Sequence, residues 1–156
     1  MSNEKLQNLC EQIWDKYEKE LQILKDAKTV LFAGVIDGRN IWKSDIDKKL
    51  AQLKAIEAYV PKERIYVGTS CSLLHVPFTL KYEDKLSAEI KSWLSFAVEK
   101  LSEISILTHL FFEIPMCEHG MKAYEQNQKS AKTRQSSLLI HDEKVSARVN
   151  SLSKLE

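Results

Sequence analysis

The continuous apolar run at residues 29–36, TVLFAGVI, is the feature that most constrains the fold of this chain. Apolar and β-branched residues without polar alternation are typical of a strand that is buried on both faces, as in a parallel sheet. A second, shorter candidate strand follows at residues 64–70, RIYVGTS. A parallel sheet needs other elements packed on both of its faces, and two strands alone are too few to provide this. Parallel barrels close with eight strands. The sequence therefore predicts part of a larger parallel sheet.

Amphipathic helical patterns surround the two candidate strands. Apolar residues recur at three- and four-residue spacings across residues 4–27, which predicts a leading helix. Between the strands we expect a second helix that begins at Ser44 as N-cap and ends at Pro61. After the second strand we expect a long helix, from Ser87 as N-cap through Leu107. This alternation of helices with buried strands favours βαβ units around a parallel sheet.

The last part of the chain is polar and helix-compatible over residues 121–135, and Asp142 is placed to cap a final helix. The predicted fold class is α/β and helix-rich, with about two parallel strands and long helices that form part of a (β/α)8 barrel. We expect a single unit over residues 1–156, divided into a leading helix (1–28), two strand–helix units (29–115) and a helical, linker-like tail (116–156).

Composition and charge exclude several classes of function. The 23 basic and 22 acidic side chains give a formal charge of +1, so neither a nucleic-acid stripe nor a membrane-binding patch is expected. Three cysteines are an odd number without framework spacing, which suits a reducing compartment. The first residues show no basic region followed by an apolar run, so we expect no signal peptide. These observations predict a soluble cytoplasmic protein.

The polar turn Asp37-Gly38-Arg39-Asn40 follows the first strand, at the rim where barrel enzymes place functional groups. One interpretation is that Arg39 binds a substrate carboxylate with its two-pronged guanidinium, with Asn40 and Asp37 beside it. The alternative is that Arg39 pairs with Asp37 or caps neighbouring carbonyls, and we give it more weight because half-buried arginines are usually satisfied within the protein.

Histidine and cysteine side chains offer weaker candidates. His75 would need an orienting carboxylate to act as a base, so a core histidine bonded to backbone is favoured, although His75 stays among the candidate substrate-binding residues. Cys71 is expected to be a small buried thiol. Cys117 and His119 resemble metal ligands, but no second pair stands at a suitable spacing. We therefore assign no catalytic residue and no metal ligand.

The three tryptophans differ in their expected roles. Trp14 and Trp93 lie on the inner stripes of predicted helices, which favours the core over a stacking platform for a ligand ring. Trp42 follows the polar turn and is more open to a binding role.

Several of these motifs resemble segments of the cobalamin-independent methionine synthase family. VLFAGVIDGRNIW (30–42) resembles the seventh strand and turn of that family's N-terminal barrel, TSCSLLHVP (69–77) the eighth strand and its loop, and IKSWLSFAVEKL (90–101) the helix that follows. The tail resembles the segment that links the family's two barrels, through Asn127, Ala131, Arg134, Ser137, Val145 and Arg148. Phe78-Thr79 departs from the family pattern, where Val-Asp is more usual.

The resemblance implies a role in methionine biosynthesis. Members of the family transfer a methyl group from 5-methyltetrahydrofolate with a polyglutamate tail to homocysteine, and they use zinc. The resemblance places the zinc ligands and the homocysteine site in the C-terminal barrel, and the folate contacts near the start of the N-terminal barrel. None of these residues can be carried onto this sequence, so we expect no cofactor bound by this chain alone and no catalysis by it alone.

Three functions remain open. The chain is part of a methyltransferase that acts with the remainder of the enzyme, or it is a structural module that associates with itself and catalyses nothing. The third is a weak binder of folate polyglutamate or another carboxylate through Arg39 and Asn40. The expected partners are accordingly the missing remainder or a second copy, with neither nucleic acid nor membrane.

Overall fold

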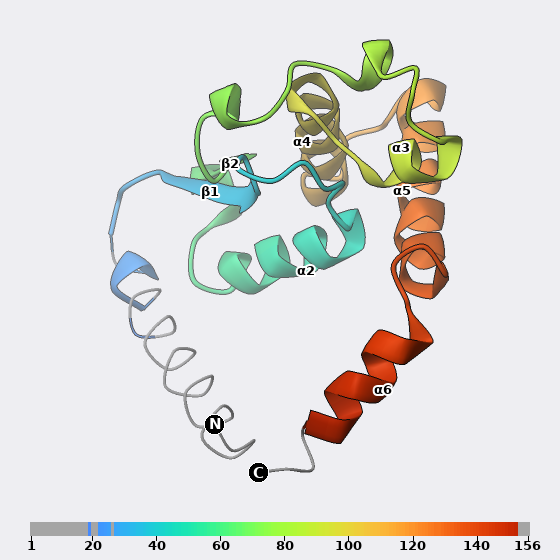
Figure 1. Cartoon of the computed structure of the whole chain (residues 1–156). Helices are drawn as coiled ribbons and strands as arrows, with labels where there is room; N and C mark the ends of the chain where they lie inside the picture. The colour runs from blue at the N-terminus through green and yellow to red at the C-terminus, as the bar shows by residue number, and fades with distance from the viewer. Residues whose placement is uncertain (1–18, 20–21, 26, 153–156) are drawn as a thin grey trace.

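The computed structural model describes residue 19, residues 22–25 and residues 27–152 of the chain (Figure 1). Most of the leading helix expected at residues 4–27 lies outside these described residues. In chain order the helices and strands are β1 (Leu31–Ile36), α2 (Ile46–Glu57), β2 (Ile65–Thr69), α3 (Ala88–Trp93), α4 (Ala97–Phe111), α5 (Glu118–Ser136) and α6 (Glu143–Leu152), with short 3-10 turns at Lys62–Arg64, Leu73–His75 and Leu80–Tyr82.

Strands β1 and β2 pair in parallel, as the sequence predicts. Leu31 lies opposite Ile65 and Ala33 opposite Val67, and the register then shifts before Ile36. The parallel pairing requires a crossover, and α2 supplies it. The helix-rich α/β class with two parallel strands among the described residues is confirmed.

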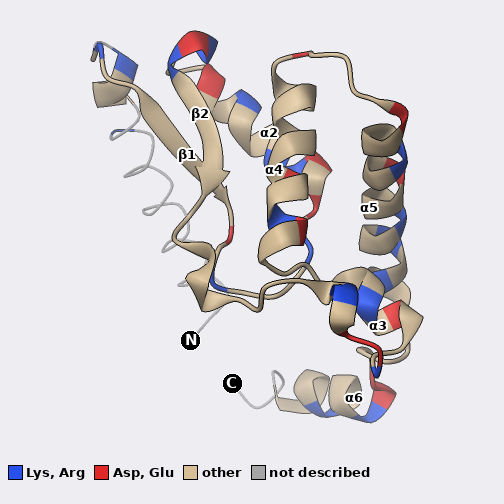
Figure 2. Cartoon of the chain, turned by 90° about the horizontal axis from the view of Figure 1, so that it is seen from above, with Lys and Arg blue, Asp and Glu red and all other residues tan. Residues whose placement is uncertain are grey.

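One face of the sheet is packed and the other is open. Helices α2 and α4 contact the strands, and Figure 2 shows the strands at one side of the molecule with α2 and α4 between them and α5. On the opposite face the Phe32 side chain is 76% exposed and that of Tyr66 is 53% exposed. The expected burial of the strand on both faces is therefore not met by the described residues. The larger of two core clusters consists of Ala33, Ile36, Ile46, Leu53, Val60, Ile65, Ile106, Leu107 and Phe111. The smaller one is formed by Leu80, Leu94 and Phe96.

The long helix expected from Ser87 is two helices, so that prediction is wrong in its middle. Ser87 does cap α3, because its hydroxyl accepts from the Ile90 N–H at 3.3 Å. Helix α3 ends at Trp93. The Trp93 carbonyl accepts from Lys43 N at 2.8 Å, and Ser95 N donates to Ile41 O at 2.8 Å. These bonds to a distant segment replace helical ones and separate α3 from α4.

Helix α2 begins one residue later than predicted. Its N-cap is Asp45, whose carboxylate accepts from Lys48 N at 3.2 Å, and not Ser44. Ser44 is instead held by its backbone, since its N–H donates to Glu103 Oε1 at 3.3 Å and its carbonyl accepts from Asn127 Nδ2 at 2.8 Å.

The tail is bonded to the rest of the molecule through α5. Asn127 Oδ1 accepts from Ile46 N at 3.3 Å, and Ser130 Oγ donates to Ser92 O at 2.6 Å, which fixes α5 against α2 and α3. Helix α6 follows, capped by Asp142 as predicted, with Lys144 N donating to its carboxylate at 2.7 Å. Among the residues described, none of the helices combines the length and apolarity needed to cross a bilayer.

Candidate functional site

The turns that follow the two strands lie side by side, as the sequence predicts. Ser70 N donates to Ile36 O at 2.8 Å, and Gly38 N donates to Ser70 Oγ at 3.2 Å. A Cβ atom on Gly38 would lie 2.6 Å from the backbone oxygen of Cys71. Glycine is therefore required at position 38 because the two strand ends approach so closely.

Asp37 and Asn40 hold the first turn in shape. The Asp37 carboxylate accepts from Arg39 N at 2.8 Å and from Asn40 Nδ2 at 2.6 Å, and Asn40 Oδ1 accepts from Trp42 N at 3.0 Å. The bond from the Arg39 backbone is the main reason that the pKa of Asp37 is lowered from its usual value. Both side chains thus serve the turn itself.

Arg39 is exposed at this edge of the sheet. The described residues place no carboxylate at ion-pair distance from its guanidinium, so the interpretation that its side chain pairs with Asp37 is wrong. The contact that does form is through the backbone N–H of Arg39. Carboxylate binding by Arg39 stays a prediction.

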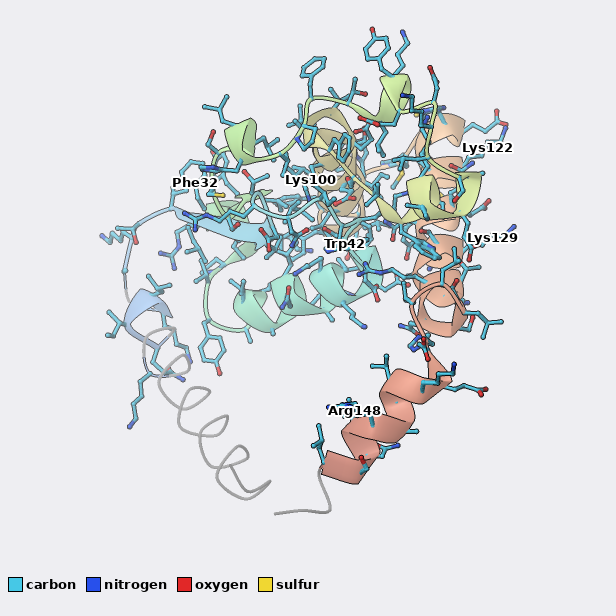
Figure 3. The ribbon with its side chains drawn as sticks, viewed as in Figure 1. Phe32, Trp42, Lys100, Lys122, Lys129 and Arg148 are labelled. Atoms are coloured by element: carbon cyan, nitrogen blue, oxygen red, sulfur yellow. The ribbon has the colours of Figure 1, made fainter. Side chains whose placement is uncertain are left out.

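Behind the turn lies a buried group of charges that sequence reasoning missed. The Lys100 side chain is fully buried, and its ammonium donates to Trp42 O at 3.2 Å (Figure 3). Burial lowers the pKa of Lys100 and of Lys43, and the carboxylate of Glu103 opposes both shifts. A signal was present in the sequence, because Lys100 and Glu103 stand at helical spacing between the apolar residues Phe96 and Leu107.

The weaker candidates lie at exposed or half-buried positions. His75 is exposed in the turn Leu73–His75, so its expected place in the core is wrong. Cys71 is half-buried and its thiol lies 3.7 Å from Ser72 O, rather than fully buried as expected. Cys117 is exposed just before α5. The part of the chain that the structure describes brings no three His, Cys, Asp or Glu side chains together as metal ligands.

Of the tryptophans that the structure describes, Trp93 is buried and Trp42 is exposed, as predicted. Trp93 is 3% exposed and belongs to the interior, whereas Trp42 is 42% exposed. The Arg134 guanidinium of α5 lies 4.3 Å from the centre of the Trp42 ring, a cation–π contact between residues that no local pattern connects. Trp14 lies outside the described residues.

Comparison with known proteins identifies the family. A family profile described as "Cobalamin-independent synthase, N-terminal domain" matches residues 8–61. The 5-methyltetrahydropteroyltriglutamate–homocysteine methyltransferase of Desulforamulus reducens is 48% identical over 126 residues, which are 81% of this chain and 16% of the relative. The enzyme of the same name from Candida albicans is 42% identical over 139 residues, or 88% of this chain and 17% of the relative.

The described strands and helices form a parallel α/β unit. This chain belongs to the cobalamin-independent methionine synthase family, in its N-terminal domain. It spans 16–17% of the length of the two relatives described above.

Proposed function

We propose that this chain forms the last two strand–helix units of an N-terminal, folate-side (β/α)8 barrel in a methyltransferase of methionine biosynthesis, and that catalysis requires the rest of that enzyme. The reaction proposed is the one named for the relatives, methyl transfer from 5-methyltetrahydropteroyltriglutamate to homocysteine. We place this activity in the cytoplasm.

The observation that carries the proposal is the open face of the sheet. Phe32 and Tyr66 lie opposite one another in register on this face, with ring centroids 5.1 Å apart. Fully burying an aromatic side chain of this size contributes about 1.5–3 kcal/mol. Further strands and their side chains would gain this free energy by covering the face, which is what a closed barrel does.

Arg39 has the supporting role in the proposal. It is the exposed cation of the strand-end turn, and the turn is held by Asp37 and Asn40 without use of the guanidinium. A glutamate carboxylate of the folate tail fits such a two-pronged donor. The described residues do not fit a zinc ion, so we derive no step through zinc from this chain.

Complementation tests the proposal. The Desulforamulus reducens enzyme would be produced without the 126 residues that match this chain, and methionine formation from homocysteine would be measured with and without added chain. We expect activity only in the mixture. Activity equal to that of the shortened enzyme alone, or activity of this chain by itself, would contradict the proposal.

A matched pair of variants separates barrel completion from non-specific rescue. Phe32→Asp places a charge on the open sheet face, and Phe78→Asp makes the same change at a phenylalanine of almost equal exposure, 74%, outside the strands. We expect Phe32→Asp to abolish complementation and Phe78→Asp to retain most of it. Equal loss in both variants would remove the role given to the open face.

A second candidate function is a self-associating module without catalytic activity. It is favoured by the unpaired outer edges that β1 and β2 show within the described residues, since such edges pair with other chains. Light scattering of the isolated chain decides this point. We expect a mass above 18.0 kDa that rises with concentration, and a monomer at all concentrations would reject the module.

A further inference from the structure

A cleft of about 360 Å³ lies between the start of α2 and the tail helix α5, away from the open face of the sheet. Its volume falls within the range of small-molecule sites, roughly 300–1,000 Å³. The charged and aromatic side chains of its wall are Lys43, Asp45, Lys48, Trp93, Arg134 and His141. Neither the strand-end motifs nor the proposed methyl transfer uses this cleft.

The charges of the wall do not balance. Asp45 is the acidic residue of the lining, and its carboxylate is already engaged, because it caps α2 and pairs with the Lys48 ammonium at 3.4 Å. Lys48 is thereby matched within the wall. Arg134 and Lys43 are the other two cations of the wall, and Lys43 also lies near the carboxylates of Glu103 and Glu99.

Arg134 is oriented by a contact that leaves its donors available. The guanidinium lies against the face of the Trp42 ring at 4.3 Å, and in the described chain no carboxylate stands at ion-pair distance from it. Stacking uses the flat face of a guanidinium, whereas its N–H groups point outward in the plane. A guanidinium fixed in this way loses less rotamer freedom when it binds a ligand.

Lys43 supplies a second, partly desolvated charge. Burial lowers its pKa, while the carboxylates of Glu103 and Glu99 oppose that shift. The positive end of the α2 dipole faces the same region, since Ile46 N and Lys48 N at the start of the helix are held by Asn127 and Asp45 in the cleft wall. A negative group in the cleft would therefore face Arg134, with Lys43 and the capped start of α2 beside it.

We propose that this cleft binds an oxyanion, a carboxylate or phosphate group of a small ligand, with Arg134 as two-pronged donor and Lys43 as the second cation. Arg134 and the oxyanion form two parallel N–H···O bonds, and the Trp42 ring supports the guanidinium from behind. This site is independent of the proposed methyltransferase role, so each can fail without the other.

Titration of the intact chain tests the site. Inorganic phosphate and glutarate are added in separate series at constant ionic strength, and tryptophan fluorescence and amide chemical shifts are followed, because Trp93 and Trp42 adjoin the cleft. We expect saturable binding of at least one anion, with shifts confined to residues 43–48 and 127–141. The stronger of the two series tells whether phosphate or carboxylate is preferred.

Variants decide whether Arg134 is the donor. Arg134→Gln should weaken binding about tenfold, the factor expected for the loss of one charged hydrogen-bond pair. Arg134→Lys, which keeps the charge without the fork, should fall between, and Arg148→Gln, a matched change at an exposed position of α6 outside the cleft, should bind as the unaltered chain does. Thermal melts show that each variant is folded.

Two results would overturn the site. The first is a response to both anions that grows linearly without saturation, as expected of ionic screening alone. The second is equal affinity in the unaltered chain and in folded Arg134→Gln or Arg134→Lys.

Discussion

Gly38 lies where the turn after β1 comes closest to the turn after β2. It is buried, its N–H donates to Ser70 Oγ, and the Cys71 backbone occupies the place where a side chain would begin. The side chains of Asp37 and Asn40 form hydrogen bonds within the turn, whereas Arg39 is exposed. The main role of the turn Asp37–Asn40 is therefore to hold the ends of β1 and β2 together.

Gly38→Ala is predicted to destabilise the chain by about 1–3 kcal/mol, the usual cost of forcing extra atoms into a filled space. The reason is the 2.6 Å approach that the new Cβ would make to the Cys71 oxygen. Urea denaturation measures the change in the free energy of unfolding. Gly68→Ala is the matched control, because a Cβ at position 68 meets nothing within 4 Å, and an equal loss there would refute the steric explanation.

At the scale of elements, the start of α2 and the break between α3 and α4 are set by partners far away in the chain. Asp45 is a local cap, but Asn127, Glu103 and the carbonyl of Trp93 reach the same segment from other helices. The helix borders are consequently tertiary features as much as local ones.

Asp45→Ala is predicted to cost about 1 kcal/mol in unfolding free energy, the typical value of an N-cap. Its carboxylate accepts from Lys48 N, which would lose its partner. Ser44→Ala serves as control, since the contacts of Ser44 in the structure are made by its backbone. Chemical denaturation of both variants checks the assignment, and a larger loss for Ser44→Ala would restore Ser44 as the cap.

The contact between α5 and α2 predicts a pH dependence in the alkaline range. Tyr124 donates its hydroxyl to Asp47, and burial together with this bond raises the pKa of Tyr124 to about 12. The unfolded chain loses that proton near pH 10, so the folded state binds more protons between pH 10 and 12 and stability falls as pH rises through this window. The unfolding free energy of the unaltered chain should drop more steeply there than that of Tyr124→Phe. Parallel slopes would show that Tyr124 does not couple the two helices.

The strands and most helices could be predicted because their signals are local. The run at residues 29–36 and the turn after it define β1 whatever surrounds them, and Ser87 and Asp142 cap the helices expected of them. The break after Trp93 had no local signal, because apolar residues continue at helical spacing through Leu94 and Ala97. Of the site, the adjacency of the turns was predictable, but the Arg134–Trp42 contact arises only when α5 docks.

At the scale of the whole molecule, the distribution of apolar surface is uneven. A core lies between the sheet and helices α2 and α4. On the opposite face of the sheet, Phe32, which is labelled in Figure 3, and its strand partner Tyr66 are exposed. Exposed apolar side chains of this size on an open sheet are typical of a surface that meets another part of a protein.

Phe32→Asp is predicted to change the unfolding free energy by less than about 1 kcal/mol, because exposed positions contribute little. Leu107→Ala, at a fully buried position of the core, should cost about 2–5 kcal/mol. Urea denaturation of the two variants compares the faces directly. A loss of several kcal/mol for Phe32→Asp would mean that the open face is already packed in solution.

The bond from Ile46 N to Asn127 Oδ1 joins residues 81 positions apart. During synthesis the ribosome releases α2 long before it releases Asn127, so the first backbone N–H of α2 waits for its acceptor while much of the chain is still being made. The local cap, Asp45 with Lys48 N, is available as soon as α2 has been made, whereas the Ile46 N–H obtains its side-chain acceptor only after Asn127 of α5 has been added.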